Sequence, residues 1–107
     1  MHTVVCLNIR CNKRDKNIHP VYRIFLDDHL VIERRFWATA PDYFIQEQLT
    51  LNNDGNEHNI YVKNIFEDRG EIYTHDVKFF NGEDKSRIEV EYEFVDEKQF
   101  TFKLPKR

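Results

Sequence analysis

Apolar and polar side chains alternate along most of this chain, with the period of two residues that is typical of a β-strand with one buried face. The pattern predicts eight strands, at residues 3–11, 21–26, 30–38, 43–51, 58–64, 71–80, 88–94 and 100–104. Turn residues separate these strands at intervals of ~8–12 residues. The chain is therefore predicted to form a single all-β domain over residues 1–107, an antiparallel β-sandwich of jelly-roll-like architecture.

The alternation also assigns a buried and a solvated face to individual strands. The first strand places four side chains on the face that we expect in the core: Val5, Leu7, Ile9 and Cys11. The segment 88–94 alternates without a break and turns three acidic side chains to water: Glu89, Glu91 and Glu93. We expect this row to be a solvated strand face on which like charges hinder edge-to-edge aggregation. Binding of a basic partner is the alternative interpretation.

One segment, residues 43–51, fits two kinds of secondary structure. Asp42 is a suitable N-cap for a helix that begins there. Ile45, Leu49 and Leu51 also fit one face of a strand, which Glu47 interrupts. We favour the strand.

Two acidic turns punctuate the pattern. Residues 27–29, Asp-Asp-His, suit a tight turn because aspartate tolerates turn geometry. The Asp54-Gly55 dipeptide is the strongest turn signal in the chain and predicts a hairpin. The same stretch resembles the opening of a calcium-binding loop, but the glutamate that closes such loops is missing, so we favour the hairpin.

Composition agrees with a β-rich domain. Alanine, the best helix former, occurs only at Ala38 and Ala40. The net charge of −3 argues against a protein that binds nucleic acid by neutralising phosphates. The sequence also has no apolar run of the length that a membrane helix needs, and no apolar stretch of a signal peptide at its start.

The two cysteines indicate the redox compartment. Cys6 and Cys11 lie on opposite faces of the first predicted strand, about 17 Å apart at ~3.4 Å per residue. A disulfide needs Cα atoms within ~7 Å. We therefore expect two free thiols, as in a protein that folds in a reducing cytoplasm.

Candidate catalytic chemistry is sparse in the sequence. The five histidines do not fall at spacings that present a pair to one metal ion, and Ser86 has no nucleophile elbow around it. The three glycines all lie at predicted turns, so no phosphate-binding loop is expected. These patterns predict a protein that is not an enzyme and that holds no metal or cofactor.

One segment, residues 34–44, combines aromatic and arginine side chains around a break between two strands, at residues 39–42. Trp, Tyr and Arg dominate the hot spots of protein interfaces. The candidate partner-binding residues are Arg34, Arg35, Trp37, Tyr43 and Phe44. Trp37 has the opposite parity to Ile32 and Phe36, so we expect it off the main core face. Packing of Trp37 at the rim of the core is the alternative.

Three stretches carry a resemblance to known families. They are Tyr22–Asp28 (YRIFLDD), Gly55–Val62 (GNEHNIYV) and Glu71–Phe79 (EIYTHDVKF), within residues 21–80. Their strand patterning is similar to that of non-catalytic carbohydrate-binding modules with jelly-roll folds. The chain also resembles small proteins encoded by tailed bacteriophages, through the patterns at residues 23–28 and 33–48.

The resemblance implies a non-enzymatic structural or assembly protein, such as a capsid decoration or cement protein of a phage virion. Such a protein is assembled in the host cytoplasm, binds protein partners in a capsid lattice or other large assembly, and can form homo-oligomers. A cytoplasmic location outside a virion is the alternative, and no nucleic acid or membrane is expected as a partner. The second functional expectation is a module that binds carbohydrate or another small ligand, with Trp37 and Tyr43 as a stacking platform.

Overall fold

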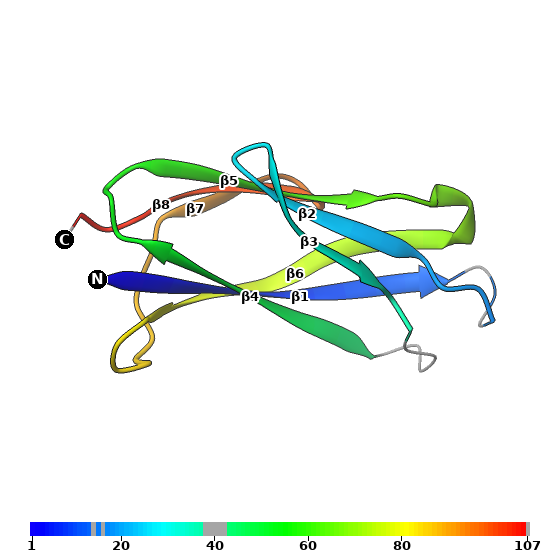
Figure 1. The fold of residues 1–107 in the computed structure, drawn as a ribbon, viewed down its shortest axis with the longest axis horizontal. Helices are drawn as coiled ribbons and strands as arrows, with labels where there is room; N and C mark the ends of the chain where they lie inside the picture. The colour runs from blue at the N-terminus through cyan, green and yellow to red at the C-terminus, as the bar shows by residue number, and fades with distance from the viewer. Residues whose placement is uncertain (14, 16, 38–42, 107) are drawn as a thin grey trace.

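This computed structural model describes residues 1–13, 15, 17–37 and 43–106. The described residues contain eight β-strands and one short 3-10 helix, joined by turns and loops (Figure 1). The strands are β1 (His2–Lys13), β2 (Val21–Leu26), β3 (His29–Arg35), β4 (Phe44–Asn52), β5 (Glu57–Asn64), β6 (Gly70–Asn81), β7 (Tyr92–Asp96) and β8 (Gln99–Lys103). The 3-10 helix, η1 (Glu67–Arg69), joins β5 to β6.

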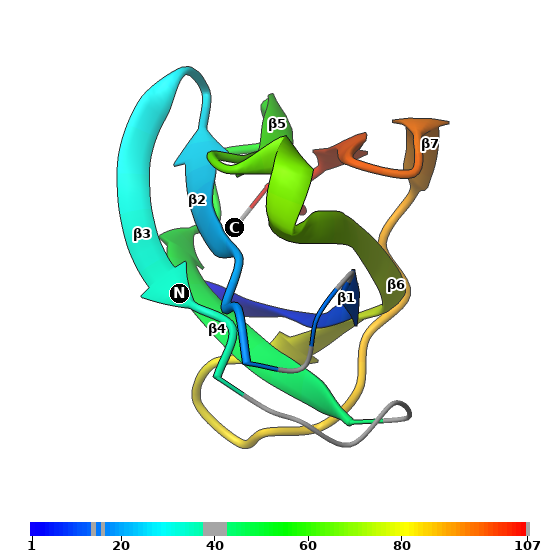
Figure 2. The same ribbon diagram turned by 90° about the vertical axis from the view of Figure 1, so that its right-hand side faces the viewer.

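The strands form two antiparallel sheets that face each other (Figures 1 and 2). The smaller sheet has the order β4-β1-β6, and the larger has the order β3-β2-β5-β8-β7. The predicted all-β antiparallel sandwich with about eight strands is therefore confirmed. The segment 43–51, which fitted a helix or a strand, is a strand that pairs with β1.

The core lies between the sheets, with β1 at the centre of the smaller one. Val5, Leu7 and Ile9 are completely buried there, as the alternation predicted. Tyr22 and Phe100, from the larger sheet, lie on the opposite side of the core. Each fully buried side chain of this size contributes about 1.5–3 kcal/mol to folding. These residues hold the two sheets together.

The turn between β2 and β3 is as tight as the sequence predicted. Asp27 and Asp28 have φ values of 50° and 69°, so both adopt the left-handed conformation. Two such residues in a two-residue loop form a type I′ turn, whose twist matches that of the flanking strands. The hairpin places Asp27 beside β5, where its N–H donates to the carbonyl oxygen of Asn59 at 2.9 Å.

The predicted hairpin at Asp54-Gly55 is wrong. β4 pairs with β1 in the smaller sheet, whereas β5 pairs with β2 and β8 in the larger one. The residues between them carry the chain from one sheet to the other, with Gly55 at φ 72°. The Asp-Gly signal correctly marks a change of direction, but local turn chemistry does not specify which sheet receives the next strand.

The predicted strand at residues 88–94 is shifted in the structure. β7 begins only at Tyr92 and continues to Asp96. The preceding segment instead runs beside β6, where the N–H of Ile88 donates to the carbonyl oxygen of Phe79 at 3.0 Å. Ile88 and Val90 still pack against the core, so the inward assignment of these two side chains is correct. Tyr92 and Phe94 remain substantially exposed because β7 is an edge strand.

Candidate partner-binding site

Trp37 lies on the surface beside the end of β3. It is 57% exposed, while its neighbour Phe36 is 2% exposed. The parity argument is thus confirmed, and the alternative of Trp37 packed in the core is wrong. The Trp37 ring contacts that of Tyr43, with centroids 5.5 Å apart and planes inclined by 53°. The strand predicted to continue to residue 38 is too long, because β3 ends at Arg35 and Phe36 and Trp37 follow it outside the strand. Residue 38 and the predicted break at residues 39–42 lie outside the described residues.

A second aromatic pair lies on the outer face of the smaller sheet. Phe44 begins β4 opposite Arg10 of β1, and His75 of β6 lies opposite Asn8. The two rings meet edge to face, with centroids 5.9 Å apart. Sequence reasoning missed His75, because its proximity to Phe44 depends on the registers of both strands with β1.

These four residues, Trp37, Tyr43, Phe44 and His75, are called the aromatic pairs below. Trp37, Tyr43 and Phe44 are each more than two-fifths exposed. Each ring contacts one aromatic neighbour. Exposed aromatic surface of this kind suits the apolar anchor of an interface.

Arg34, a predicted partner-binding residue, is engaged within the chain. Its Nε and Nη2 donate to Glu47 at 2.6 and 3.0 Å. The hydroxyl of Tyr22 donates to the same carboxylate at 2.5 Å. The hydrogen bond to Glu47 raises the pKa of Arg34. The pKa of Tyr22 is also raised, chiefly because its hydroxyl is buried. Arg34 therefore joins β3 to β4, whereas Arg35 is exposed at the end of β3.

Glu47 is the residue that the sequence pattern placed least well. It interrupts the apolar face of β4 in the sequence, yet it points into the sandwich and is 3% exposed. The pattern of β4 alone could not reveal its partners, which come from β2 and β3 of the other sheet.

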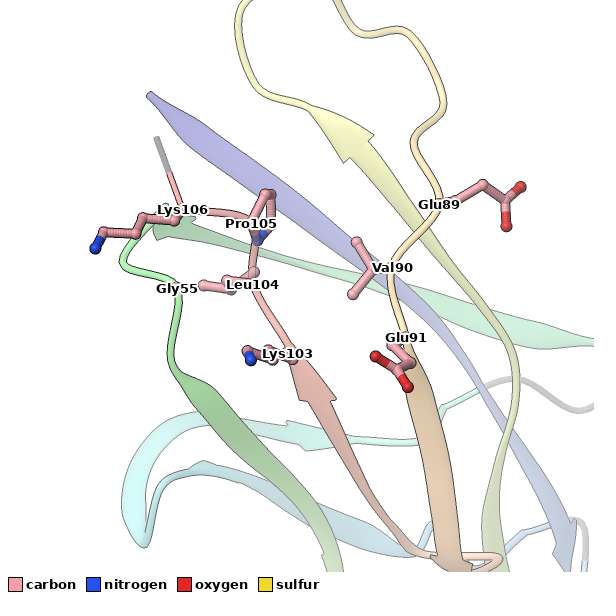
Figure 3. Close-up of a pocket in the computed structure, with 8 residues that line it drawn as sticks. All are labelled: Gly55, Glu89, Val90, Glu91, Lys103, Leu104, Pro105 and Lys106. Carbon is pink, nitrogen blue, oxygen red and sulfur yellow. The ribbon is translucent and has the colours of Figure 1, made fainter.

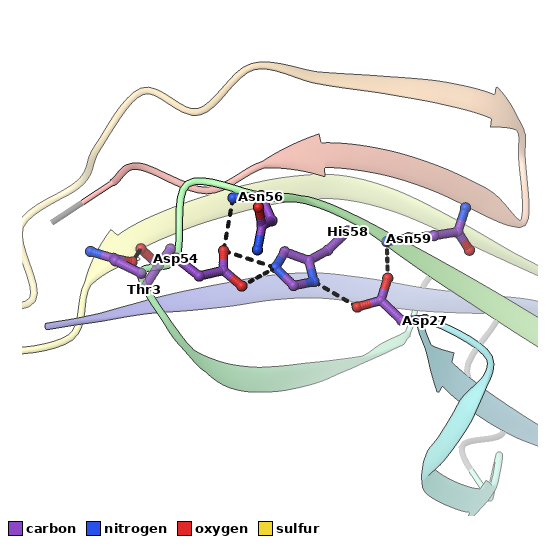
Figure 4. Close-up of polar contacts among 7 residues, drawn as sticks. Thr3, Asp27, Asp54, Asn56, His58 and Asn59 are labelled. Atoms are coloured by element: carbon purple, nitrogen blue, oxygen red, sulfur yellow. Dashed lines mark hydrogen bonds and ion pairs between the residues drawn. The ribbon is translucent and has the colours of Figure 1, made fainter.

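A second polar cluster closes one end of the sandwich (Figure 4). His58 Nδ1 lies 2.6 Å from Asp27 Oδ2, and His58 Nε2 lies 3.0 Å from Asp54 Oδ2. Both ring nitrogens thus face a carboxylate, an arrangement that suits the imidazolium because a neutral imidazole has only one donor. Burial lowers the pKa of His58, but hydrogen bonds to Asp27 and Asp54 outweigh it and raise the pKa overall. The cluster ties the β2–β3 turn to the connection between the sheets.

Other candidate chemistry has a clear position in the structure. Cys6 and Cys11 are free and buried, as predicted, with Cys11 in the core cluster. Within the described ranges, no three His, Cys, Asp or Glu side chains come together in a way that could hold a metal ion. No helix in the described part of the chain is long and apolar enough to cross a membrane.

No family model, curated protein or solved structure matches this chain. Function therefore has to be inferred from the surface of the chain itself.

Proposed function

We propose that the chain is a non-enzymatic structural or assembly protein that docks on a protein partner through the aromatic pairs. The specific form of this role that the phage resemblance favours is a small virion component, such as a capsid decoration or cement protein assembled in the host cytoplasm. In that role the partner is a capsid lattice, alone or together with further copies of the chain.

The observation that carries this proposal is the exposure of Trp37. A tryptophan that is 57% exposed, and contacts an exposed tyrosine, leaves apolar surface in water that a partner can cover. Phe44, at the start of β4, adds a further exposed ring next to Tyr43 in the chain. Arg35 adds a guanidinium that can pair with a carboxylate or stack on a ring of the partner.

The test is co-sedimentation of the purified chain with capsids of the virus that encodes it. We expect the wild type to pellet with the capsids and Trp37→Ala to remain in the supernatant, with unchanged circular dichroism. The matched control is Tyr61→Ala, which removes an exposed ring from the outer face of the larger sheet and should still pellet. Equal sedimentation of Trp37→Ala and wild type would exclude the aromatic pairs as the docking surface.

Glycan binding is the second candidate function, and a depression on the smaller sheet favours it. The depression measures about 420 Å³, and Gln46, Gln48 and Thr50 of β4 line it together with Phe80. Amide and hydroxyl groups exchange hydrogen bonds with sugar hydroxyls, and an aromatic ring packs on the apolar face of a pyranose. The Trp37–Tyr43 pair is less suited to this purpose, because its rings are inclined by 53° and offer no flat platform.

Titration with a panel of soluble oligosaccharides separates the two functions. Glycan binding in this depression predicts chemical-shift changes at the side-chain amides of Gln46 and Gln48, and weaker binding by Gln48→Ala. Quenching of the fluorescence of Trp37, the single tryptophan, would instead place the sugar at the aromatic pairs. A panel without any response would remove this candidate and leave the assembly role.

A further inference from the structure

β7 is a free edge of the larger sheet. In the part of the chain that the structure describes, β8 is its one strand partner, with Tyr92 opposite Phe102. The N–H of Lys103 donates to the carbonyl oxygen of Glu91 at 3.1 Å. Because backbone groups alternate in direction along an antiparallel strand, the N–H and C=O groups of Tyr92 and Phe94 point away from β8. These groups can pair with another strand.

Two aromatic side chains lie beside this free backbone. Tyr92 and Phe94 are 45% and 38% exposed. Each also contacts the buried ring of Phe100, with centroids 6.5 and 5.4 Å away. The apolar core therefore reaches the surface along the inward side of β7, where a further strand would cover it.

The segment that contains β7 is acidic. The segment 88–97 contains no lysine or arginine and has five exposed acidic residues: Glu89, Glu91, Glu93, Asp96 and Glu97. Figure 3 shows Glu89 and Glu91 projecting from the chain that leads into β7, beside a depression of about 390 Å³. Lys98 lies in the β7–β8 turn, and Lys103 of β8 is bonded to Glu91 through its backbone.

We propose that the edge of β7 binds an extended segment of a protein partner in which lysine or arginine alternates with apolar residues. Strand addition pairs the backbone of the segment with the free groups of Tyr92 and Phe94. The period of two then places the apolar residues over these two rings and the basic residues beside Glu91 and Glu93. This surface is separate from the aromatic pairs and does not depend on the function proposed for them.

The charge of β7 selects against a second copy of the same strand. Two β7 edges side by side would bring glutamate rows together, and like charges on neighbouring strands are destabilising. The ladder between β7 and β8 is also irregular between Phe94 and Asp96, which limits the length of regular edge that another strand can extend. A basic heterologous segment relieves the repulsion that a second copy would increase.

The test uses a fluorescent synthetic peptide, acetyl-Lys-Val-Lys-Val-Lys-Val-amide, titrated with the full chain and followed by anisotropy. We expect saturable binding that weakens with added salt, and slower hydrogen exchange at the amides of Tyr92 and Phe94. Reversing the charge with Glu91→Lys and Glu93→Lys together should weaken binding about tenfold or more. The matched control, Asp28→Lys with Glu33→Lys, changes the net charge equally in the β2–β3 hairpin, at the opposite edge of the larger sheet, and should weaken binding much less. Trp37→Ala should bind as the wild type does.

Three results would overturn this assignment. The first is an equal affinity of the charge-reversed and control variants for the peptide, with circular dichroism confirming that both are folded. The second is equal binding of a peptide in which glutamate replaces lysine. The third is binding without protection of the Tyr92 and Phe94 amides, which would place the peptide elsewhere on the chain.

Discussion

The carboxylate of Glu47 accepts a hydrogen bond from the hydroxyl of Tyr22 at 2.5 Å, across the interface between the two sheets. Tyr22 is completely buried, so its hydroxyl depends on this acceptor. Arg34 covers the carboxylate from the solvent side, where its own side chain is 45% exposed. A buried acid thus has its charge balanced by Arg34 and both of its oxygen atoms engaged in hydrogen bonds.

Replacement of Glu47 by leucine should destabilise the fold by about 1–3 kcal/mol, because it leaves the Tyr22 hydroxyl buried without a partner. Urea unfolding at constant m-value measures the change in the free energy of unfolding. Glu47→Gln is the matched control. It keeps one oxygen that can accept from Tyr22, and it loses the ion pair and one hydrogen bond from the half-exposed Arg34, so it should cost less than Glu47→Leu.

The double variant Tyr22→Phe, Glu47→Leu separates the unsatisfied hydroxyl from other effects. Because it removes both partners, it should recover most of the stability that Glu47→Leu alone loses. A double variant no more stable than the single one would show that Glu47 contributes through packing or through Arg34 instead.

The cluster around His58 should make stability depend on pH. The pKa of His58 in the folded protein is raised above its ordinary value of 6.5. A raised pKa gives a stabilisation that is complete below pH 6.5 and is lost as pH rises through the folded-state value. The free energy of unfolding of the wild type should therefore fall with pH over this window, relative to that of His58→Gln.

Two further variants test whether the carboxylates cause this pH dependence. Asp27→Asn removes the acceptor of Nδ1 and should reduce the difference between wild type and His58→Gln. His29→Gln, in the adjacent hairpin, should leave it unchanged. If the free energy of unfolding of His58→Gln fell with pH as steeply as that of the wild type, another group would be the cause of the pH dependence.

The strand pattern was predictable because, in a strand with one buried face, alternate residues are apolar. Phe100 and Phe102 of β8 show this alternation clearly. The central strand β1 departs from it, since it is buried on both faces from Thr3 to Ile9. The positions that the sequence could not assign depend on partners distant in the chain. Glu47 is explained only by Tyr22 and Arg34 on the other sheet.

Turn chemistry had a similar limit. Both acidic turns were recognised from their residues, but only Asp27-Asp28 closes a hairpin. The connection at Asp54-Gly55 crosses between sheets, and the contact of Asp54 with His58 follows from that crossing.

Of the predicted partner-binding residues, Trp37 and Phe44 were assigned to the surface by parity or composition. Arg34 could not be told apart from Arg35, because its contact with Glu47 of β4 depends on how the two sheets pack.

Gly70 should be the glycine least tolerant of substitution. Its φ of 148° disfavours any L side chain, and a Cβ atom would lie 2.6 Å from the backbone oxygen of Asn12. Gly70→Ala should therefore cost about 1–3 kcal/mol or more in thermal or urea unfolding. Gly55→Ala is the matched comparison, since its φ is also positive but the nearest atom to its Cβ, Lys106 Cβ, lies further away, at 3.0 Å. An equal loss in both variants would show that φ alone decides the cost.

Both cysteines should resist alkylation in the folded protein. Burial raises the pKa of Cys11 to about 11, with a smaller opposing effect of Lys13, and burial also raises the pKa of Cys6. The thiolate is the reactive form, and a pKa of about 11 in place of the ordinary 9.0 lowers the thiolate fraction of Cys11 at neutral pH about a hundredfold. Mass spectrometry after iodoacetamide treatment should show little modification of the native chain and rapid modification in urea. Rapid modification of the native chain would indicate local opening of β1.

Phe36 and Trp37 are adjacent in the chain but should respond in opposite ways to truncation. Phe36→Ala empties a position in the core that is 2% exposed and should cost about 3–5 kcal/mol. Trp37→Ala removes a ring that is 57% exposed and should change the free energy of unfolding by about 1 kcal/mol or less. Urea unfolding of the two variants measures both values. A large loss of stability in Trp37→Ala would mean that the contact of Trp37 with Tyr43 supports the fold. A loss of capsid binding by this variant would then no longer report on docking. A small loss keeps the two roles apart, with Phe36 holding the sandwich and Trp37 left free for a partner.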